Sequence, residues 1–136
     1  MRRMTGIIFS DLGQAASFMA LDWVQEALRE ALGFNCFPAT LNLRPKDAED
    51  GRLWEAVRNE SESISLPGAG GHCSARLYRV EIHGPENRPN DRIAGAVLLP
   101  EVSGYPKDKI EIVAPVRLKD KFGVGDGDQL ILEFVN

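Results

Sequence analysis

The chain has 136 residues, of which 43% are hydrophobic and 26% are charged, and this is the size and composition of one globular domain with a buried core. Its net charge of −4 argues against a broad nucleic-acid surface, because such surfaces hold phosphates mainly with clustered Lys and Arg. No stretch approaches the roughly 20 apolar residues of a membrane span. The apolar run of Ile7, Ile8 and Phe9 is far shorter than a signal-peptide core. We therefore expect a cytoplasmic protein with one domain over residues 1–136.

The first predicted elements are a strand, a loop over residues 10–16 and a second short strand over residues 17–21, all within TGIIFSDLGQAASFMAL. Asp22 is expected to cap the helix that follows, with Gln25 as its capping-box partner. That helix is expected to end where Gly33 can take the left-handed backbone conformation. Its predicted buried stripe consists of Val24, Leu28, Ala31 and Leu32.

The next stretch, NCFPATLNLRP, predicts a short strand over residues 39–43 with a proline on either side. Because side chains alternate along a strand, Thr40 and Asn42 would point to the same face, about 7 Å apart. Two neutral oxygens would then point the same way. The same spacing also fits the solvent face of an amphipathic edge strand.

A polar segment follows, in which the spacing of Leu53, Trp54 and Val57 predicts a short peripheral helix with one buried side. After it, the glycine cluster GAGGHC over residues 68–73 precedes a stretch of period-two alternation. That alternation predicts one or two strands, with Ala75, Leu77, Val80 and Ile82 as their buried residues.

The C-terminal part predicts three more strands, in IAGAVLLP, in KIEIVAP and after the Asp-Gly turn of GVGDGDQLILEFV. The whole chain then has six or seven short strands, one strong helix and one weak helix. Such a pattern, with many Gly and Pro turns, favours a mainly β fold with helical decoration, in the form of a closed or nearly closed small barrel.

The two cysteines and two histidines predict no metal site. Cys36 and Cys73 are too far apart for a CxxC motif, and His72 and His83 fit no zinc spacing.

Four segments, LGFNCFPATLNLRP, GAGGHCSARLY, AVLLPEVSGYPKDKIEIVAP and VRLKDKFGVGDGDQL, together and in this order resemble the archaeal CTP-dependent riboflavin kinases. The resemblance implies a six-stranded closed β-barrel of the cradle-loop, riboflavin kinase-like kind. It also implies transfer of the γ-phosphoryl group of CTP to the 5′-hydroxyl of riboflavin, giving FMN and CDP. The expected partners are these small molecules, and no nucleic acid, membrane or obligate protein partner is expected.

The resemblance assigns Thr40 and Asn42 to an Mg²⁺ ion held with the nucleotide phosphates, and hard oxygen ligands suit that ion. Lys119 stands where the family usually has Arg, so it would offer the nucleotide a point charge and no bidentate contact. Ala15 and Ala39 stand where the family has Gly. The loop that resembles the family's nucleotide-binding loop comprises Ser10, Asp11, Leu12, Gly13, Gln14, Ala15, Ala16 and Ser17.

Ser103, Tyr105 and Glu111 fall on positions similar to those around the phosphate end of the flavin's ribityl chain. Glu111 would orient the riboflavin hydroxyl or accept its proton, and phosphoryl transfer does not require a strong base. Without the resemblance, a carboxylate on the wet face of a strand is the favoured interpretation of Glu111.

Gly70, Gly71 and His72 would line the cleft, or else form a solvated loop. Two other functions stay open. One is a diverged barrel that binds a flavin or nucleotide without turnover, which Ala15, Ala39 and Lys119 favour. The other is a DNA-binding or interaction domain, because GDGDQLILEF also resembles swapped-hairpin transcription factors.

Overall fold

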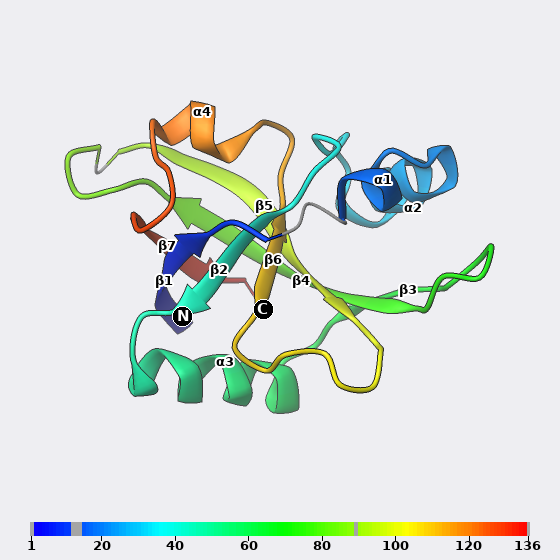
Figure 1. Cartoon of the computed structure of the whole chain (residues 1–136), viewed down its shortest axis with the longest axis horizontal. Helices are drawn as coiled ribbons and strands as arrows, with labels where there is room; N and C mark the ends of the chain where they lie inside the picture. Colours follow the sequence, from blue (N-terminus) through cyan, green and yellow to red (C-terminus); the bar gives the residue numbers. More distant parts are fainter. Residues whose placement is uncertain (1, 12–14, 89, 136) are drawn as a thin grey trace.

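The computed structural model describes residues 2–11, 15–88 and 90–135. Seven strands and four helices lie in these ranges (Figure 1). None of the described helices is long and apolar enough to cross a bilayer. The elements are β1 (Arg2–Phe9), α1 (Ala15–Met19), α2 (Asp22–Leu32), β2 (Leu41–Pro45), α3 (Ala48–Glu60), β3 (Ile64–Leu66), β4 (Ala75–His83), β5 (Arg92–Pro100), β6 (Ile110–Val113), α4 (Leu118–Phe122) and β7 (Gln129–Phe134).

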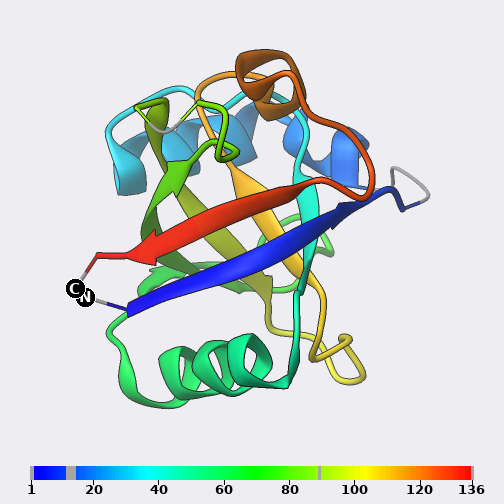
Figure 2. The same ribbon diagram turned by 90° about the vertical axis from the view of Figure 1, so that its left-hand side faces the viewer.

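Six strands close into an antiparallel barrel in the order β4-β5-β6-β2-β1-β7, and β7 returns to pair with β4. β3 adds to the outer edge of β4 through pairs such as Ile64↔Leu77. The first and last strands lie side by side, as Figure 2 shows, with Arg2 opposite Phe134. The mainly β, closed six-stranded barrel that the sequence predicts is therefore confirmed.

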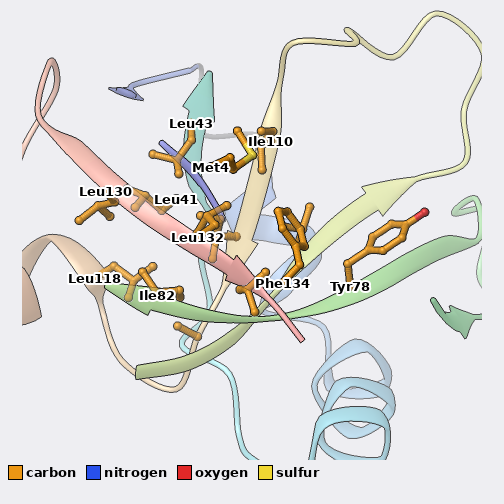
Figure 3. Packing of buried hydrophobic residues seen from close by; sticks show 14 of the residues in the cluster. Met4, Leu41, Leu43, Tyr78, Ile82, Ile110, Leu118, Leu130, Leu132 and Phe134 are labelled. Atoms are coloured by element: carbon orange, nitrogen blue, oxygen red, sulfur yellow. The ribbon is translucent and has the colours of Figure 1, made fainter. Parts of the chain in front are cut away.

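The barrel interior is filled by apolar side chains that alternate along the strands. Leu130, Leu132 and Phe134 of β7 all point inward, and Leu41 and Leu43 of β2, on the other side of β1, point into the same core (Figure 3). α3 covers one end of the barrel and α4 the other (Figure 2). Three more members of this core are Trp54, which stacks on Phe134 from α3, and Leu118 and Phe122 of α4.

A second apolar cluster lies outside the barrel, where α1 and α2 cover β3, β4, β5 and β6. Leu77 of β4 faces this outer cluster, whereas its neighbour Tyr78 belongs to the barrel core. Both faces of β4 are therefore buried at this point. Along this one strand, the buried apolar residues lie on the outer face up to Leu77 and on the barrel face from Tyr78 onward. The helix side of the outer cluster is formed by Met19, Val24, Leu28 and Leu32.

The short strand predicted over residues 17–21 is wrong, because α1 occupies residues 15–19. Phe18 and Met19 turn toward α2 in this helix: Met19 is fully buried, and the Phe18 ring packs edge-on against Trp23 at 5.9 Å. Burial against α2 thus selects the helical conformation over the extended one.

The predicted N-cap of α2 is also wrong. Leu21 takes the extended cap conformation, Asp22 is the first helical residue, and the cap residue makes no side-chain hydrogen bond. The Gln25 amide donates instead to the Met19 carbonyl oxygen at 2.7 Å, which joins α1 to α2. The other end is as expected, with Gly33 left-handed at φ 86°.

Two further differences concern element boundaries and number. The predicted strand over residues 39–43 is β2 at residues 41–45, because the amide of Ala39 donates to the Phe37 carbonyl in a tight turn before the ladder begins. The expectation of one strong and one weak helix is incomplete, since α1 and α4 were not predicted. The weak helix around Trp54 is confirmed as α3.

Candidate active site

The candidate site lies on the outer face of the barrel wall where β2 pairs with β6. Leu41 and Leu43 point into the barrel, so Asn42 points outward, and it lies directly opposite Glu111 of β6. Ile110 and Ile112 are also core residues, which fixes Glu111 on the same outer face. Strand register thus brings together two of the predicted site residues, Asn42 and Glu111. The third, Thr40, precedes β2.

Glu111 is a buried carboxylate with two hydroxyl donors. The residue is 6% exposed, Thr40 Oγ1 donates to its Oε1 at 3.3 Å, and the Tyr105 hydroxyl donates to its Oε2. Burial, followed by this hydrogen bond to Glu111, raises the pKa of Tyr105 well above its usual range. Tyr105 therefore remains a protonated donor at any physiological pH and holds the carboxylate in place.

Asn42 carries an unsatisfied polar atom into the site. Its Oδ1 is buried and has no hydrogen-bond partner among the residues that the structure describes. A buried acceptor without a partner costs free energy, so its retention calls for a group that supplies the missing interaction. Oxygen atoms from Thr40, Asn42 and Glu111 gathered on one face form a set of donors that fits a hard divalent cation.

A first cavity, of about 160 Å³, opens over this triad, and we term it the lysine cavity. Lys109 and Lys119 supply its cationic groups. Lys109 pairs with Asp11, and Lys119 lies 3.5 Å from both Ser10 Oγ and Asp126 Oδ1. The remaining lining residues are Phe9, Ala15, Ala16, Ala39, Thr40, Leu41, Asn42 and Glu111.

The Ser10 hydroxyl donates to Asp126 at 2.8 Å, and this bond, followed by the charge of Lys119, lowers the pKa of the Asp126 carboxyl. The Asp126 carboxylate thus remains charged at neutral pH. This contact ties the end of β1 to the turn before β7 and leaves the ammonium group of Lys119 at the cavity wall.

A second cavity, of about 340 Å³, adjoins the first at Ala15, Lys109 and Glu111. We term it the aromatic cavity, because Phe18, His72 and Tyr105 line it together with aliphatic side chains. The rings of Phe18 and His72 are 5.2 Å apart at an angle of 62°. The two cavities therefore approach Glu111 from two sides, one with lysines and one with apolar walls.

Several predicted site residues lie away from this centre. Ser103 is exposed and lines a separate hollow beside Trp54 and Arg58. Gly70 and Gly71 form an exposed turn with φ of 57° and 82°, and of their segment His72 reaches the aromatic cavity. Ser17 lies on α1 and lines neither cavity. Leu12, Gly13 and Gln14 lie outside the described residues.

The alanines that replace family glycines fit without backbone strain. No described residue other than glycine has a positive φ, so neither Ala15 nor Ala39 occupies a conformation that a Cβ would oppose. Both methyl groups instead form part of the lysine-cavity wall.

Sequence reasoning missed Lys109, Phe18 and Asp126. Lys109 lies in a polar loop directly before β6, and a lysine at such a position is usually solvated. The sequence predicts Phe18 in a strand and Asp126 in a turn, and neither pattern indicates a site residue. The one available signal was the spacing of Lys109 and Glu111 in the predicted strand KIEIVAP, which would put both on one strand face.

Comparison with known proteins identifies the family of this chain. The family model CTP-dep_RFKase, described as "Domain of unknown function DUF120", matches residues 8–134. The chain belongs to this CTP-dependent riboflavin kinase family. The match spans all three elements of the site, namely β2, the loop with Tyr105, and β6.

Curated relatives in this family carry the name riboflavin kinase. One from Pyrobaculum arsenaticum is 32% identical over 96% of this chain and 60% of its own length. One from Archaeoglobus fulgidus is 30% identical over 98% of this chain and 54% of its length. One from Aeropyrum pernix is 33% identical over 92% of this chain and 89% of its length. The chain thus spans little more than half of the first two relatives.

Proposed function

We propose that this protein transfers the γ-phosphoryl group of CTP to the 5′-hydroxyl of riboflavin in the presence of Mg²⁺, giving FMN and CDP. The observation that carries the proposal is the buried Glu111 carboxylate, which lies between the lysine cavity and the aromatic cavity and opposite the unsatisfied Asn42 oxygen. The name of the family and the names of the curated relatives support the choice of acceptor and donor.

The lysine cavity suits the triphosphate. Lys109 and Lys119 are only partly exposed, at 20% and 29% of their side-chain surface, so their charges act in a less screened environment than on an open surface. A further hollow of about 140 Å³ continues past Thr40 and is lined by Phe37 and Arg117. Its mixed apolar and cationic wall suits the nucleoside part of the donor.

The aromatic cavity suits the flavin. Its volume of about 340 Å³ is in the range of small-molecule pockets, and the rings of Phe18 and His72 offer apolar surface to a planar ligand. A flavin ring placed here would direct its ribityl chain toward Glu111, where the two cavities adjoin.

Thr40 and Asn42 would hold the Mg²⁺ ion, whose charge offsets that of the phosphate oxygens. In the reaction the 5′-hydroxyl oxygen bonds to the γ-phosphorus, and the bond from that phosphorus to the bridging oxygen of CDP breaks. Glu111 orients the hydroxyl and accepts its proton. Tyr105 and Thr40 keep the carboxylate aimed at the acceptor through their hydrogen bonds, and Lys109 and Lys119 stabilise the phosphoryl charge.

Cytoplasmic localisation belongs to the same proposal, since both substrates are polar small molecules. A diverged protein that binds flavin or nucleotide without turnover is the main competing function, and the lack of strain at Ala15 and Ala39 counts against it.

The test is chromatographic detection of FMN after the purified chain is incubated with riboflavin, Mg²⁺ and either CTP or ATP. We expect FMN with CTP, none with ATP, and a loss of FMN in the Glu111→Gln variant, which keeps the size of the side chain. Folding of both proteins is checked by circular dichroism. Absence of FMN with either nucleotide from folded protein would reject the kinase and favour the non-catalytic binding protein.

A further inference from the structure

A second group of polar side chains lies on the outer surface where the barrel closes. In β4, Val80 and Ile82 point into the core, so Glu81 and His83 point outward. In β7, the outward-facing Glu133 is paired directly across from Glu81. We propose that Glu81, His83 and Glu133 form a binding site for one Zn²⁺ ion, separate from the candidate active site.

The distances between the potential ligand atoms fit a tetrahedral ion. His83 Nε2 lies 3.0 Å from Glu81 Oε1 and 3.7 Å from Glu133 Oε2, and all three ligand atoms lie within 4.8 Å of one another. Zinc bonds of about 2.0–2.1 Å in a tetrahedron put neighbouring ligand atoms about 3.3 Å apart. The two histidine distances bracket that value, so small side-chain rotations would complete the geometry.

The state of His83 is the independent observation that points to a ligand. The residue is 9% exposed, yet its Nε2 makes no hydrogen bond of acceptable geometry within the described part of the chain. The carboxylates lie at ion-pair distance without meeting this nitrogen along a hydrogen-bond direction. A buried imidazole nitrogen within 4 Å of two carboxylate oxygens provides, together with them, ligand atoms of the kinds that zinc accepts.

The paired glutamates place like charges opposite each other, and each has an arginine neighbour. Like charges directly opposite each other on neighbouring strands destabilise a sheet. Arg92 lies 3.3 Å from Oε1 of Glu81, and Arg3 lies 3.3 Å from Oε2 of Glu133, so each arginine contacts the same carboxylate oxygen that lies near His83. These arginines orient the carboxylates, and their charge lowers the affinity for a further cation, so we expect moderate zinc binding.

The site is far round the barrel from Thr40 and Asn42. In the ring of six strands, β4 lies opposite β2, and β7 lies opposite β6. An ion here therefore does not contact the substrates. It would join β4 to β7, the pairing that closes the barrel, and an imidazole in the ligand set favours Zn²⁺ over Mg²⁺.

The experiment is calorimetric titration of Zn²⁺ into the full chain with excess Mg²⁺ present. Cys73 is exposed and adjacent to His72, and this pair could also bind zinc. The reference protein is therefore the His72→Gln/Cys73→Ser variant, in which we expect one bound Zn²⁺ per chain. Adding His83→Gln or Glu133→Gln to the reference should weaken binding at least tenfold. Adding Glu62→Gln, at an exposed site outside the cluster, should leave it unchanged.

Thermal unfolding provides a second measurement that separates loss of binding from loss of folding. Zn²⁺ should raise the Tm of the reference protein and of the Glu62→Gln protein, and should not raise that of the His83→Gln protein. Glu81→Gln is the further variant if His83→Gln does not fold, because Glu81 is more exposed. Zinc binding that is absent from the reference protein, or that survives in both cluster variants, would overturn the proposal. Neither result depends on FMN formation.

Discussion

At the scale of single residues, replacement of Asn42 is the most direct test of the candidate active site. Asn42→Ala removes an oxygen that has no hydrogen-bond partner among the described residues. We expect the free energy of unfolding to change by less than about 0.5 kcal/mol. Mg²⁺-dependent FMN formation should fall by about 100-fold or more, measured as initial rates over a range of Mg²⁺ concentrations.

Asn59→Ala is the matched control, since Asn59 is exposed on α3 and lines neither cavity. It should leave both rate and stability unchanged. A normal rate in Asn42→Ala would remove this residue from the metal site.

The two cysteines should differ sharply in reactivity. Burial raises the pKa of the Cys36 thiol to about 11, whereas Cys73 is exposed. We expect iodoacetamide at about pH 8 to modify Cys73 alone in the folded chain, and both cysteines in denaturant. Mass spectrometry of the tryptic peptides gives the extent of labelling at each site.

The pH dependence of stability that Cys36 contributes follows from the same burial of its thiol. The folded-state pKa of Cys36 lies above the ordinary value of 9.0 for a thiol, so its contribution to stability is complete below about pH 9 and is lost as the pH rises through about 11. Equal labelling of both cysteines at pH 8 would contradict the buried thiol.

At the scale of elements, the start of α3 depends on one side chain. Asp47 caps the helix by accepting a hydrogen bond from the amide of Asp50 at 3.0 Å. Asp47→Ala should lower the Tm by a few degrees in a thermal scan at neutral pH. Glu55→Ala, at an exposed position in the middle of the same helix, should have no such effect.

The bond from Asp50 is also the main cause of the lowered pKa of Asp47. The effect of the substitution should therefore be present above the carboxyl's ordinary pKa and should disappear as the pH falls through the lowered one. A difference in Tm that persisted at lower pH would mean that the cap is not the cause.

The sequence predicted those elements whose signal is local. α2 has an apolar stripe of Val24, Leu28 and Leu32 and a terminal glycine, and all of these lie as expected. α1 has only five residues, and its helical state depends on the contact of Phe18 and Met19 with α2. No local sequence pattern indicates that contact, so the short apolar run at residues 17–21 predicts a strand instead of a helix.

The candidate site divides in the same way. Alternation along two strands was enough to place Asn42 and Glu111 outward, and the family resemblance linked them. Strand register, which made them neighbours, could not be derived from the sequence. Lys109 and His72 reach the cavities from loops, and the positions of loops depend on the packing of the whole barrel.

At the scale of the whole molecule, stability depends on the last strand filling the barrel. Leu132 is fully buried in the core, and Leu132→Ala should cost about 2–5 kcal/mol in the free energy of unfolding. Denaturant titration followed by circular dichroism measures the change. Val102→Ala is the control, since Val102 is 51% exposed and should tolerate the change. Equal stability of the two variants would mean that β7 contributes little to the core.

Closure of the barrel has a consequence for synthesis on the ribosome. β1 is made before the other six strands, yet one of its edges pairs only with β7, the last of the seven strands in chain order, and β7 also completes an edge of β4. Until β7 leaves the ribosome, the nascent chain carries two open sheet edges. Unpaired edges are templates for pairing with other chains. Ribosome-bound chains of this protein should therefore need protection from chaperones until β7 has emerged.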